Sequence, residues 1–353
     1  MEKEINKPLY QIYFQDLTRT NSAVSKAPED VANIASKIGF KKAIINVKYR
    51  GVKNKLFALK MTIKTINEWF SLLGKVKVNS IVLIQIPAGG SWIRDIVLTR
   101  LKKRKNVKYI AFFHDVELLR HGVKDEKQNK FFNFICDISD QMIVHNSQMF
   151  RWFVSQGVKE DKLVSLEIFD YIFLPKDRNI NFDKTVIIAG NLDLKKNKYL
   201  KELDKLNIPF RLFGLNYDNS ISSDTVVYKG LFSPEELPYK LDGSFGLIWD
   251  GDSVDTCSGD FGNYLKYNNP HKLSLYLASG FPVFIWKYAA EAKFVEENGV
   301  GFTIEKIADI TKILDSLTEA QYVELKNRVQ TVSKKLVSGY YTKRALEKSL
   351  ENL

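Results

Sequence analysis

The chain has 353 residues, of which 45% are hydrophobic and 12% aromatic, and its formal net charge is +12. This length exceeds one ordinary core and predicts two domains, while the composition excludes a long disordered segment. The positive charge calls for an anionic partner, for which a nucleotide, a nucleic acid and an anionic membrane surface are alternatives.

The first half of the chain alternates short apolar runs with amphipathic stretches, which predicts strands and helices around a parallel sheet. The first strand is expected over residues 9–14. A helix over 28–38 has Pro28 in its first turn and Gly39 just past its end, as is usual at helix ends. Further elements are expected as strands over 43–47, 80–87, 107–113 and 141–144, and as helices over 62–73, 92–101, 127–138 and 147–156. Residues 1–168 are therefore predicted to form a Rossmann-like lobe.

The periodicity is interrupted over residues 169–183, which are predicted to link two domains. A second domain is expected over 184–330, and residues 331–353 are expected to form a helix that packs back on the first lobe. Strands of the second domain are expected over 185–189, 210–213, 225–228, 245–249 and 282–285. Helical stretches between several of them predict another parallel sheet. The predicted fold class is α/β with two Rossmann-like domains.

Neither a metal site nor a membrane span is expected. Cys136 and Cys257 are the two cysteines, too few for a disulfide framework or a cysteine-built zinc site, and the histidines have no helix-spaced pair. The first residues lack an apolar signal segment, and no apolar run reaches about 18 residues. The chain is therefore expected in the cytoplasm.

The most informative candidate site is the sequence Asn269-Pro270-His271-Lys272. Asn269 is expected to cap a helix with Pro270 as its first residue, which puts Lys272 in the first turn. A lysine there opposes the helix dipole, so the arrangement gains most when a diphosphate lies between the free N–H groups and the ammonium. An exposed lysine without a ligand is the alternative. The hypothesis requires that this helix start faces the crevice between the lobes and is not occupied by the protein's own carboxylates.

A second candidate site follows the first strand of the second lobe, where Gly190 and Asn191 precede Lys195 and Lys196. A glycine lets the backbone approach a ligand closely, and N–H groups with a lysine suit phosphate oxygens. A plain strand-to-helix turn with surface lysines explains the pattern equally well.

A third candidate is the pair His114 and Asp115 at the end of a strand of the first lobe. Such a pair can position an acceptor hydroxyl and take its proton. Alternatively, Asp115 caps the following segment and His114 fills the edge of a polar pocket. The segment 250–262, rich in glycine and aspartate, is expected to be a ligand loop, and it lacks the spacing of a calcium loop.

These motifs resemble, in their order along the chain, those of bacterial GT-B glycosyltransferases. The similar group holds the streptococcal adhesin glucosyltransferases and the β-1,6-galactofuranosyltransferases. The resemblance rests on the motifs at 114–116, 190–191, 245–249, 272–273, 277–283 and 296–302.

The resemblance implies two lobes that face each other across a cleft, with a UDP-sugar on the second lobe, a saccharide acceptor on the first and no metal. Lys272 would hold the diphosphate, and Lys195 or Lys196 would supply a second cation. The remaining residues of the nucleotide-sugar site would be Gly190, Asn191, Trp249 and His271, and a substrate loop would hold Thr18, Thr20, Asn21 and Ser22. Many retaining relatives carry a glutamate where this chain has Leu275. This departure favours inversion, with Asp115 as the base and His114 beside it.

The resemblance thus predicts an enzyme that transfers a hexose, galactofuranose or glucose, from a UDP-sugar to an acceptor on a glycan, a lipid-linked oligosaccharide or a glycoprotein. Peripheral contact with an anionic membrane and a homo-oligomer are further expectations. The alternatives are an inactive accessory subunit, a nucleic-acid binder, and an NAD-dependent epimerase or dehydrogenase. Against the last, residues 16–20 contain no glycine for a dinucleotide turn. Against the nucleic-acid binder, the basic residues are scattered and no nucleic-acid-binding motif is present.

Overall fold

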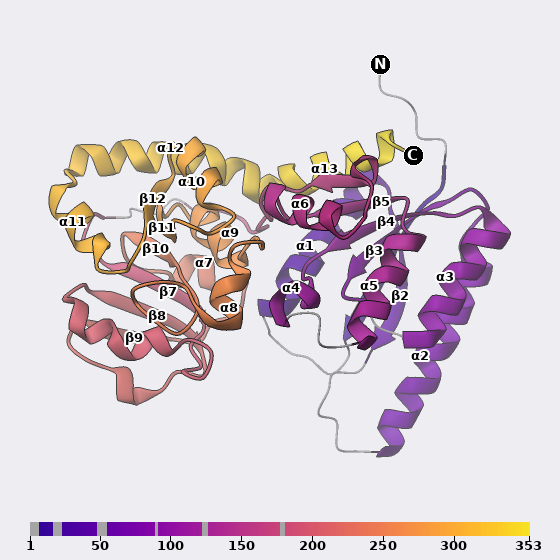
Figure 1. Ribbon diagram of the computed structural model, residues 1–353, viewed down its shortest axis with the longest axis horizontal. Coiled ribbons are helices and arrows are strands. Elements are labelled where there is room, and N and C mark those ends of the chain that lie inside the picture. The colour runs from indigo at the N-terminus through magenta and orange to yellow at the C-terminus, as the bar shows by residue number, and fades with distance from the viewer. Residues whose placement is uncertain (1–6, 17–22, 48–54, 89–90, 122–125, 177–180) are drawn as a thin grey trace.

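The chain folds into two lobes, each built around a six-stranded sheet in which all the strand pairs are parallel (Figure 1). The computed structural model describes residues 7–16, 23–47, 55–88, 91–121, 126–176 and 181–353. These observations confirm the predicted α/β class with two Rossmann-like lobes.

The first sheet has the strand order β2-β1-β3-β4-β5-β6. Its order reverses between β1 and β3, because the first crossover runs to one side of β1 and the later ones run to the other. A ligand crevice is expected at the carboxyl ends of strands at such a switch point. The strands are β1 (Leu9–Asp16), β2 (Lys41–Val47), β3 (Ile81–Ile86), β4 (Lys108–Phe113), β5 (Gln141–Val144) and β6 (Leu163–Ser165).

Helices cover both faces of the first sheet, so β3 is buried along its whole length. Trp69, Val97 and Phe132, from α2, α3 and α5, pack into the core on one face, while Val31 of α1 and Leu346 of α13 pack into the core on the other. The helices of this lobe are α1 (Ala23–Ile38), α2 (Lys55–Lys75), α3 (Ser91–Lys105), α4 (Glu117–His121), α5 (Glu126–Ile138), α6 (Ser147–Ser155) and the 3₁₀ helix η1 (Glu160–Lys162).

The second sheet has the order β12-β11-β10-β7-β8-β9, so its switch point lies between β7 and β10. Its strands are β7 (Val186–Asn191), β8 (Phe210–Leu215), β9 (Val226–Gly230), β10 (Phe245–Ile248), β11 (Val283–Trp286) and β12 (Gly301–Ile304). The remaining helices are η2 (Lys198–Leu206), η3 (Asn219–Ile221), α7 (Leu237–Lys240), α8 (Gly259–Tyr264), α9 (His271–Ala278), α10 (Ala292–Asn298), α11 (Asp309–Ser316), α12 (Glu319–Ser338) and α13 (Tyr340–Glu351).

The chain passes between the lobes twice, and the two passages touch. The backbone N–H of Tyr171 donates to Leu336 O at 3.3 Å. The carboxylate of Asp170 accepts from the N–H groups of Tyr341 and Thr342, at the first residues of α13. Helix α12 lies along the second lobe and α13 along the first, with the break between them at Gly339, whose φ is +80° (Figure 1).

The expected starts of α1 and α9 are wrong. Helix α1 begins at Ala23, so Pro28 lies inside it rather than in its first turn. A proline there forfeits one backbone hydrogen bond, and tertiary packing keeps the helix together: Val31 and Ala35 are buried in the core. Helix α9 begins at His271, and Asn269 does not cap it.

Candidate functional site

The carboxyl ends of the two sheets meet at the junction of the lobes. The hydroxyl of Tyr264, on α8, lies 3.3 Å from Asp115 Oδ1 and accepts from the N–H of Val116 at 3.0 Å. Asn146, directly after β5, donates to Asn269 Oδ1 at 2.7 Å. Residues after β4 and β5 of the first lobe therefore contact the segment between β10 and β11 of the second lobe.

The switch point of the second lobe brings together Gly190, at the end of β7, and Asp250, just after β10. Gly190 has a φ of +136°, which glycine adopts without strain. A Cβ at Gly214, its neighbour on β8, would lie 1.7 Å from Gly190 O. A side chain at Gly214 would therefore prevent this close approach of β8 to β7, whereas a Cβ at Gly190 would meet nothing within 4 Å.

Lys272 is in the first turn of α9, as predicted, and its side chain reaches this switch point. Its ammonium donates to Trp249 O at 2.8 Å and to Asp250 Oδ1 at 2.7 Å. The side chain is 19% exposed and that of Asp250 is 25% exposed. The lysine thus lies at the expected edge of the sheet. However, the Asp250 carboxylate already neutralises it, whereas the diphosphate hypothesis required a helix start that is not occupied by the protein's own carboxylates.

The other two predicted lysines lie after β7 and are exposed. Lys196 places its ammonium 5.2 Å from the centre of the Phe261 ring. The backbone N–H of Lys195 donates to Asp193 Oδ1, within the turn. Lys198, which the sequence reasoning did not select, pairs with Asp252 at 3.1 Å. Three lysines, 196, 198 and 272, therefore approach the segment after β10.

Asn191 contributes to the shape of this turn. Its side-chain oxygen accepts from the N–H of Asp193 at 3.1 Å and from the amide of Asn216 at 2.8 Å. The backbone carbonyl of Asn191 accepts from Asn197. These bonds fix the turn that follows Gly190.

The side chains of Trp249 and His271 are both packed among other residues. The indole of Trp249 is completely buried and donates to Ser253 O at 2.9 Å, so its backbone carbonyl, not its ring, contacts Lys272. His271 packs 5.0 Å from the ring of Tyr171 and 6.0 Å from that of Phe169. Burial lowers the pKa of His271 to about 4, which keeps its ring neutral at pH 7.

His114, after β4, is held in one tautomer. Its Nε2 lies 2.6 Å from Gln85 Oε1, and the amide nitrogen of Gln85 donates to Pro28 O, so the imidazole Nε2–H is the donor. The ring stacks on Phe169 with centroids 5.6 Å apart. Burial, helped by His145 and His271, lowers the pKa of His114 to about 3. A group with so low a pKa is a weak proton acceptor.

Asp115 has the opposite properties. Burial raises its pKa to about 6, while Arg120 acts to lower it. The carboxylate pairs with the Arg120 guanidinium and is still 34% exposed. It is thus largely ionised at pH 7, accessible, and closer than His114 to the pKa that suits a general base. Of the predicted pair, Asp115 fits the role of base better.

The start of α9 is anchored on the first lobe. Asn269 donates its side-chain amide to His145 O and Glu167 O, each at 2.9 Å. Its backbone N–H donates to His145 Nδ1 at 2.9 Å. These contacts explain why Asn269 does not cap the helix: its side chain is committed to the other lobe.

The predicted substrate loop, with Thr18, Thr20, Asn21 and Ser22, lies outside the described residues. It follows directly on β1, whose carboxyl end borders the switch point of the first sheet. Among the described residues, no group of three or more metal-ligating side chains is close enough to hold an ion. The described helices also include none with the length and apolar character needed to cross a bilayer.

Several residues of the site were not predicted from the sequence. Gln85 could have been identified, because it is a polar residue within the apolar run of β3. Asp250 follows an apolar strand, and the reasoning assigned it only to a loop. Arg120 lies five residues after Asp115, so its pairing with that carboxylate is local. Tyr264 could not be identified from the sequence, because its contact with Asp115 arises from the docking of α8 on α4.

Comparisons with known proteins match both lobes. The family model "Glucosyltransferase 3-like, N-terminal domain" matches residues 11–168, and "Glucosyltransferase 3-like, C-terminal domain" matches residues 186–349. The chain is 36% identical to the β-1,6-galactofuranosyltransferase WbbI of Escherichia coli K12 over 264 residues, 73% of this chain and 76% of WbbI. It is 25% identical to glucosyltransferase 3 of Streptococcus gordonii, over 78% of this chain and 80% of that protein.

Solved structures share the fold at low sequence identity. Anabaena HepE in complex with UDP superposes with a TM-score of 0.61 at 10% identity, covering 98% of this chain and 100% of HepE. The lipopolysaccharide outer core galactosyltransferase WaaB gives a TM-score of 0.59 at 11% identity, covering 97% of this chain and 99% of WaaB. With both domain models matched and a relative above one-third identity, the chain belongs to the glucosyltransferase 3-like family of glycosyltransferases, with the GT-B fold.

Proposed function

We propose that the chain transfers a hexose from a UDP-sugar to a saccharide acceptor, with the UDP held at the switch point between β7 and β10. The observation that carries this proposal is Lys272, which extends from the first turn of α9 to the residues that follow β10. A helix start and an ammonium together favour a diphosphate. The diphosphate would compete with Asp250 for this ammonium.

The transfer itself needs a base on the acceptor side. The acceptor hydroxyl attacks the anomeric carbon, the bond from that carbon to the UDP oxygen breaks, and the hydroxyl proton passes to the base. Asp115 supplies that base in the proposal, because its carboxylate is accessible and its pKa is raised to about 6 by burial. The sugar is galactofuranose or glucose, as the names of the relatives suggest.

Calorimetric titration of UDP tests the nucleotide site. Lys272→Met should weaken UDP binding about tenfold or more, since a hydrogen bond to a charged group contributes about 1.5–3 kcal/mol. Lys343→Met, which also removes a helical lysine with a carboxylate partner, should leave the affinity unchanged. Unaltered UDP binding by Lys272→Met would show that the phosphate site lies elsewhere.

An inactive accessory subunit is the alternative, since such a protein would keep the fold and the nucleotide site. Hydrolysis of UDP-glucose and UDP-galactofuranose by the purified chain separates the two. We expect turnover that is lost in Asp115→Asn. UDP binding without turnover of any UDP-hexose, with or without saccharide acceptors, would favour the accessory role.

A further inference from the structure

The described part of the first lobe exposes large apolar side chains on two adjacent helices. Leu56, Leu59 and Ile63 of α2 are 74%, 58% and 51% exposed, and Trp92 of α3 is 61% exposed. Helices α2 and α3 are in contact. We call these four residues the apolar face.

Helix α2 has apolar residues on two sides. Met61, Trp69 and Leu72 are buried in the first lobe. Leu56, Leu59 and Ile63 are three and four residues apart and so share a different side of the helix. A surface helix needs one apolar side to pack on its lobe, and the second is unexplained by the fold.

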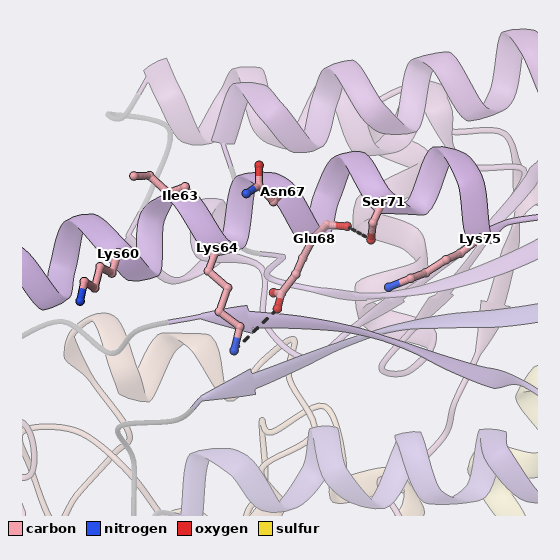
Figure 2. A pocket seen from close by; sticks show the side chains of 7 residues that line it. All are labelled: Lys60, Ile63, Lys64, Asn67, Glu68, Ser71 and Lys75. Carbon is pink, nitrogen blue, oxygen red and sulfur yellow. Dashed lines mark hydrogen bonds and ion pairs between the residues drawn. The ribbon is translucent and has the colours of Figure 1, made fainter.

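Lysines flank this second side. Lys60 and Lys64 are exposed on the same turns as Leu59 and Ile63, and Figure 2 shows Ile63 leaving α2 on one side and the two lysine side chains leaving it on another. Because successive residues are rotated by about 100° around a helix, these lysines lie beside the apolar side and do not interrupt it. Lys64 lies 3.9 Å from Glu68, the acidic residue of a helix whose sequence also holds four lysines. Exposed apolar side chains bordered by lysines are typical of helices that lie in a membrane interface.

The apolar face lies at the functional edge of the first lobe. The C-terminal ends of α2 and α3 are level, because Lys105 Nζ donates to Val76 O at 2.6 Å. Helix α2 has 21 residues and α3 has 15, so α2 extends about 9 Å further at its start, at about 1.5 Å per residue. Figure 1 shows this start beyond the other helices of the lobe. Both helices begin at the carboxyl edge of the sheet, the edge that carries Asp115.

We propose that the apolar face, with Lys60 and Lys64, docks the protein on an anionic lipid bilayer. A second copy of this chain is the less suitable occupant, because pairing two copies of α2 would bring like-charged lysines together. An anionic surface instead complements these lysines and the net charge of +12. This orientation would present an acceptor carried on a lipid to the edge where Asp115 lies; this last step rests on the proposed function.

Vesicle flotation with the full chain tests the proposal. Vesicles of equal parts phosphatidylglycerol and phosphatidylcholine should carry the protein, vesicles of phosphatidylcholine alone should carry much less, and added salt should release it. Leu59→Glu with Ile63→Glu should reduce binding to the anionic vesicles about tenfold or more. Lys60→Glu with Lys64→Glu should also reduce it.

A matched control separates docking from general charge attraction. Leu231 and Val323, in the second lobe, are 60% and 56% exposed, so Leu231→Glu with Val323→Glu changes the net charge equally at similar exposure. This control should bind vesicles like the wild type. An equal loss in the control, or no vesicle binding by the wild type, would overturn the proposal.

Light scattering, which measures the oligomeric state, tests whether a second copy of the chain covers the apolar face instead. A wild-type dimer that becomes a monomer in Leu59→Glu with Ile63→Glu, and that does not bind vesicles, would assign the apolar face to a second copy. UDP binding measured in each variant should match the wild type. Loss of vesicle binding with unchanged UDP affinity therefore tests the docking surface and does not test the nucleotide site.

Discussion

Asp115 combines accessibility with a raised pKa, and this combination can be tested through the pH dependence of the reaction. Its pKa is raised to about 6 because burial disfavours the charged carboxylate more than Arg120 favours it. If Asp115 is the base, kcat/KM should fall as the pH falls below about 6. Asp115→Asn should lower kcat by about 10²- to 10⁴-fold. A pH profile that is flat from pH 5 to 8 would contradict this role.

Asp250 offers a second test of the nucleotide site, because its carboxylate pairs with the Lys272 ammonium. Replacing Asp250 by asparagine removes the competing charge and should tighten UDP binding severalfold, provided that a diphosphate binds this lysine. Titration of UDP into the Asp250→Asn variant measures the change. Weaker binding would mean that the carboxylate itself contacts the nucleotide.

The sequence correctly predicted the location of a residue where its position along a helix or strand decides that location. Lys272 lies in a first helical turn at a strand end because Pro270 and the neighbouring strands fix that register. The pairing of Lys272 with Asp250 was not predictable, because 22 residues and a loop separate the two. The direction of the Trp249 side chain was not predictable for a related reason: the residue follows a strand, yet its indole turns into the core.

At the scale of elements, Gly214 of β8 allows the backbone of β8 to lie close to Gly190 of β7. A Cβ at Gly214 would lie 1.7 Å from Gly190 O, and the φ of Gly214 is +144°. Gly214→Ala should therefore destabilise the second lobe by several kcal/mol, through both the clash and the strained backbone. Differential scanning calorimetry measures the effect as a lower Tm.

Gly74→Ala is the matched control, since a Cβ there has nothing within 4 Å and the residue lies within α2. Alanine in a helix is favoured over glycine by up to about 1 kcal/mol. This variant should keep or raise the Tm. A Gly214→Ala protein as stable as Gly74→Ala would show that β7 and β8 separate easily.

Elements were predictable where burial on both faces gives a continuous apolar run, as in β3, and their ends were not. Helix α2 begins seven residues before the predicted start at 62, at Lys55, because its first turns have exposed apolar residues that break the expected two-sided pattern. The short strand β6 carries only three residues, too few for a period to be recognised. Strand order depends on contacts between distant segments, so the sequence did not predict it.

At the scale of the whole molecule, the contact between lobes depends on an uncharged histidine. Burial lowers the pKa of His145 to about 3, below the value of about 6.5 in an unfolded chain. Protonation would also remove the Nδ1 acceptor of the Asn269 N–H. The unfolded chain binds more protons between these two pH values, so the stabilisation is complete above pH 6.5 and declines as the pH falls toward 3.

The variant His145→Gln, which does not titrate, should lose this dependence. Below pH 6.5 the wild type should lose up to about 1.4 kcal/mol of unfolding free energy per pH unit relative to the variant. Urea denaturation at several pH values measures the difference. Parallel pH dependences for the two proteins would mean that His145 is charged in the folded chain.

The position of α13 determines the order in which the protein can be completed during synthesis. This last helix contacts α1, β5 and β6, and it buries Leu346 and Leu350. A ribosome makes the first lobe before the second, yet α1 is left to cover one face of its sheet without α13 until that helix emerges. The first lobe is therefore completed only after the second has been made, and a nascent protein lacking α13 would expose the apolar residues of β5, β6 and α1 that this helix covers.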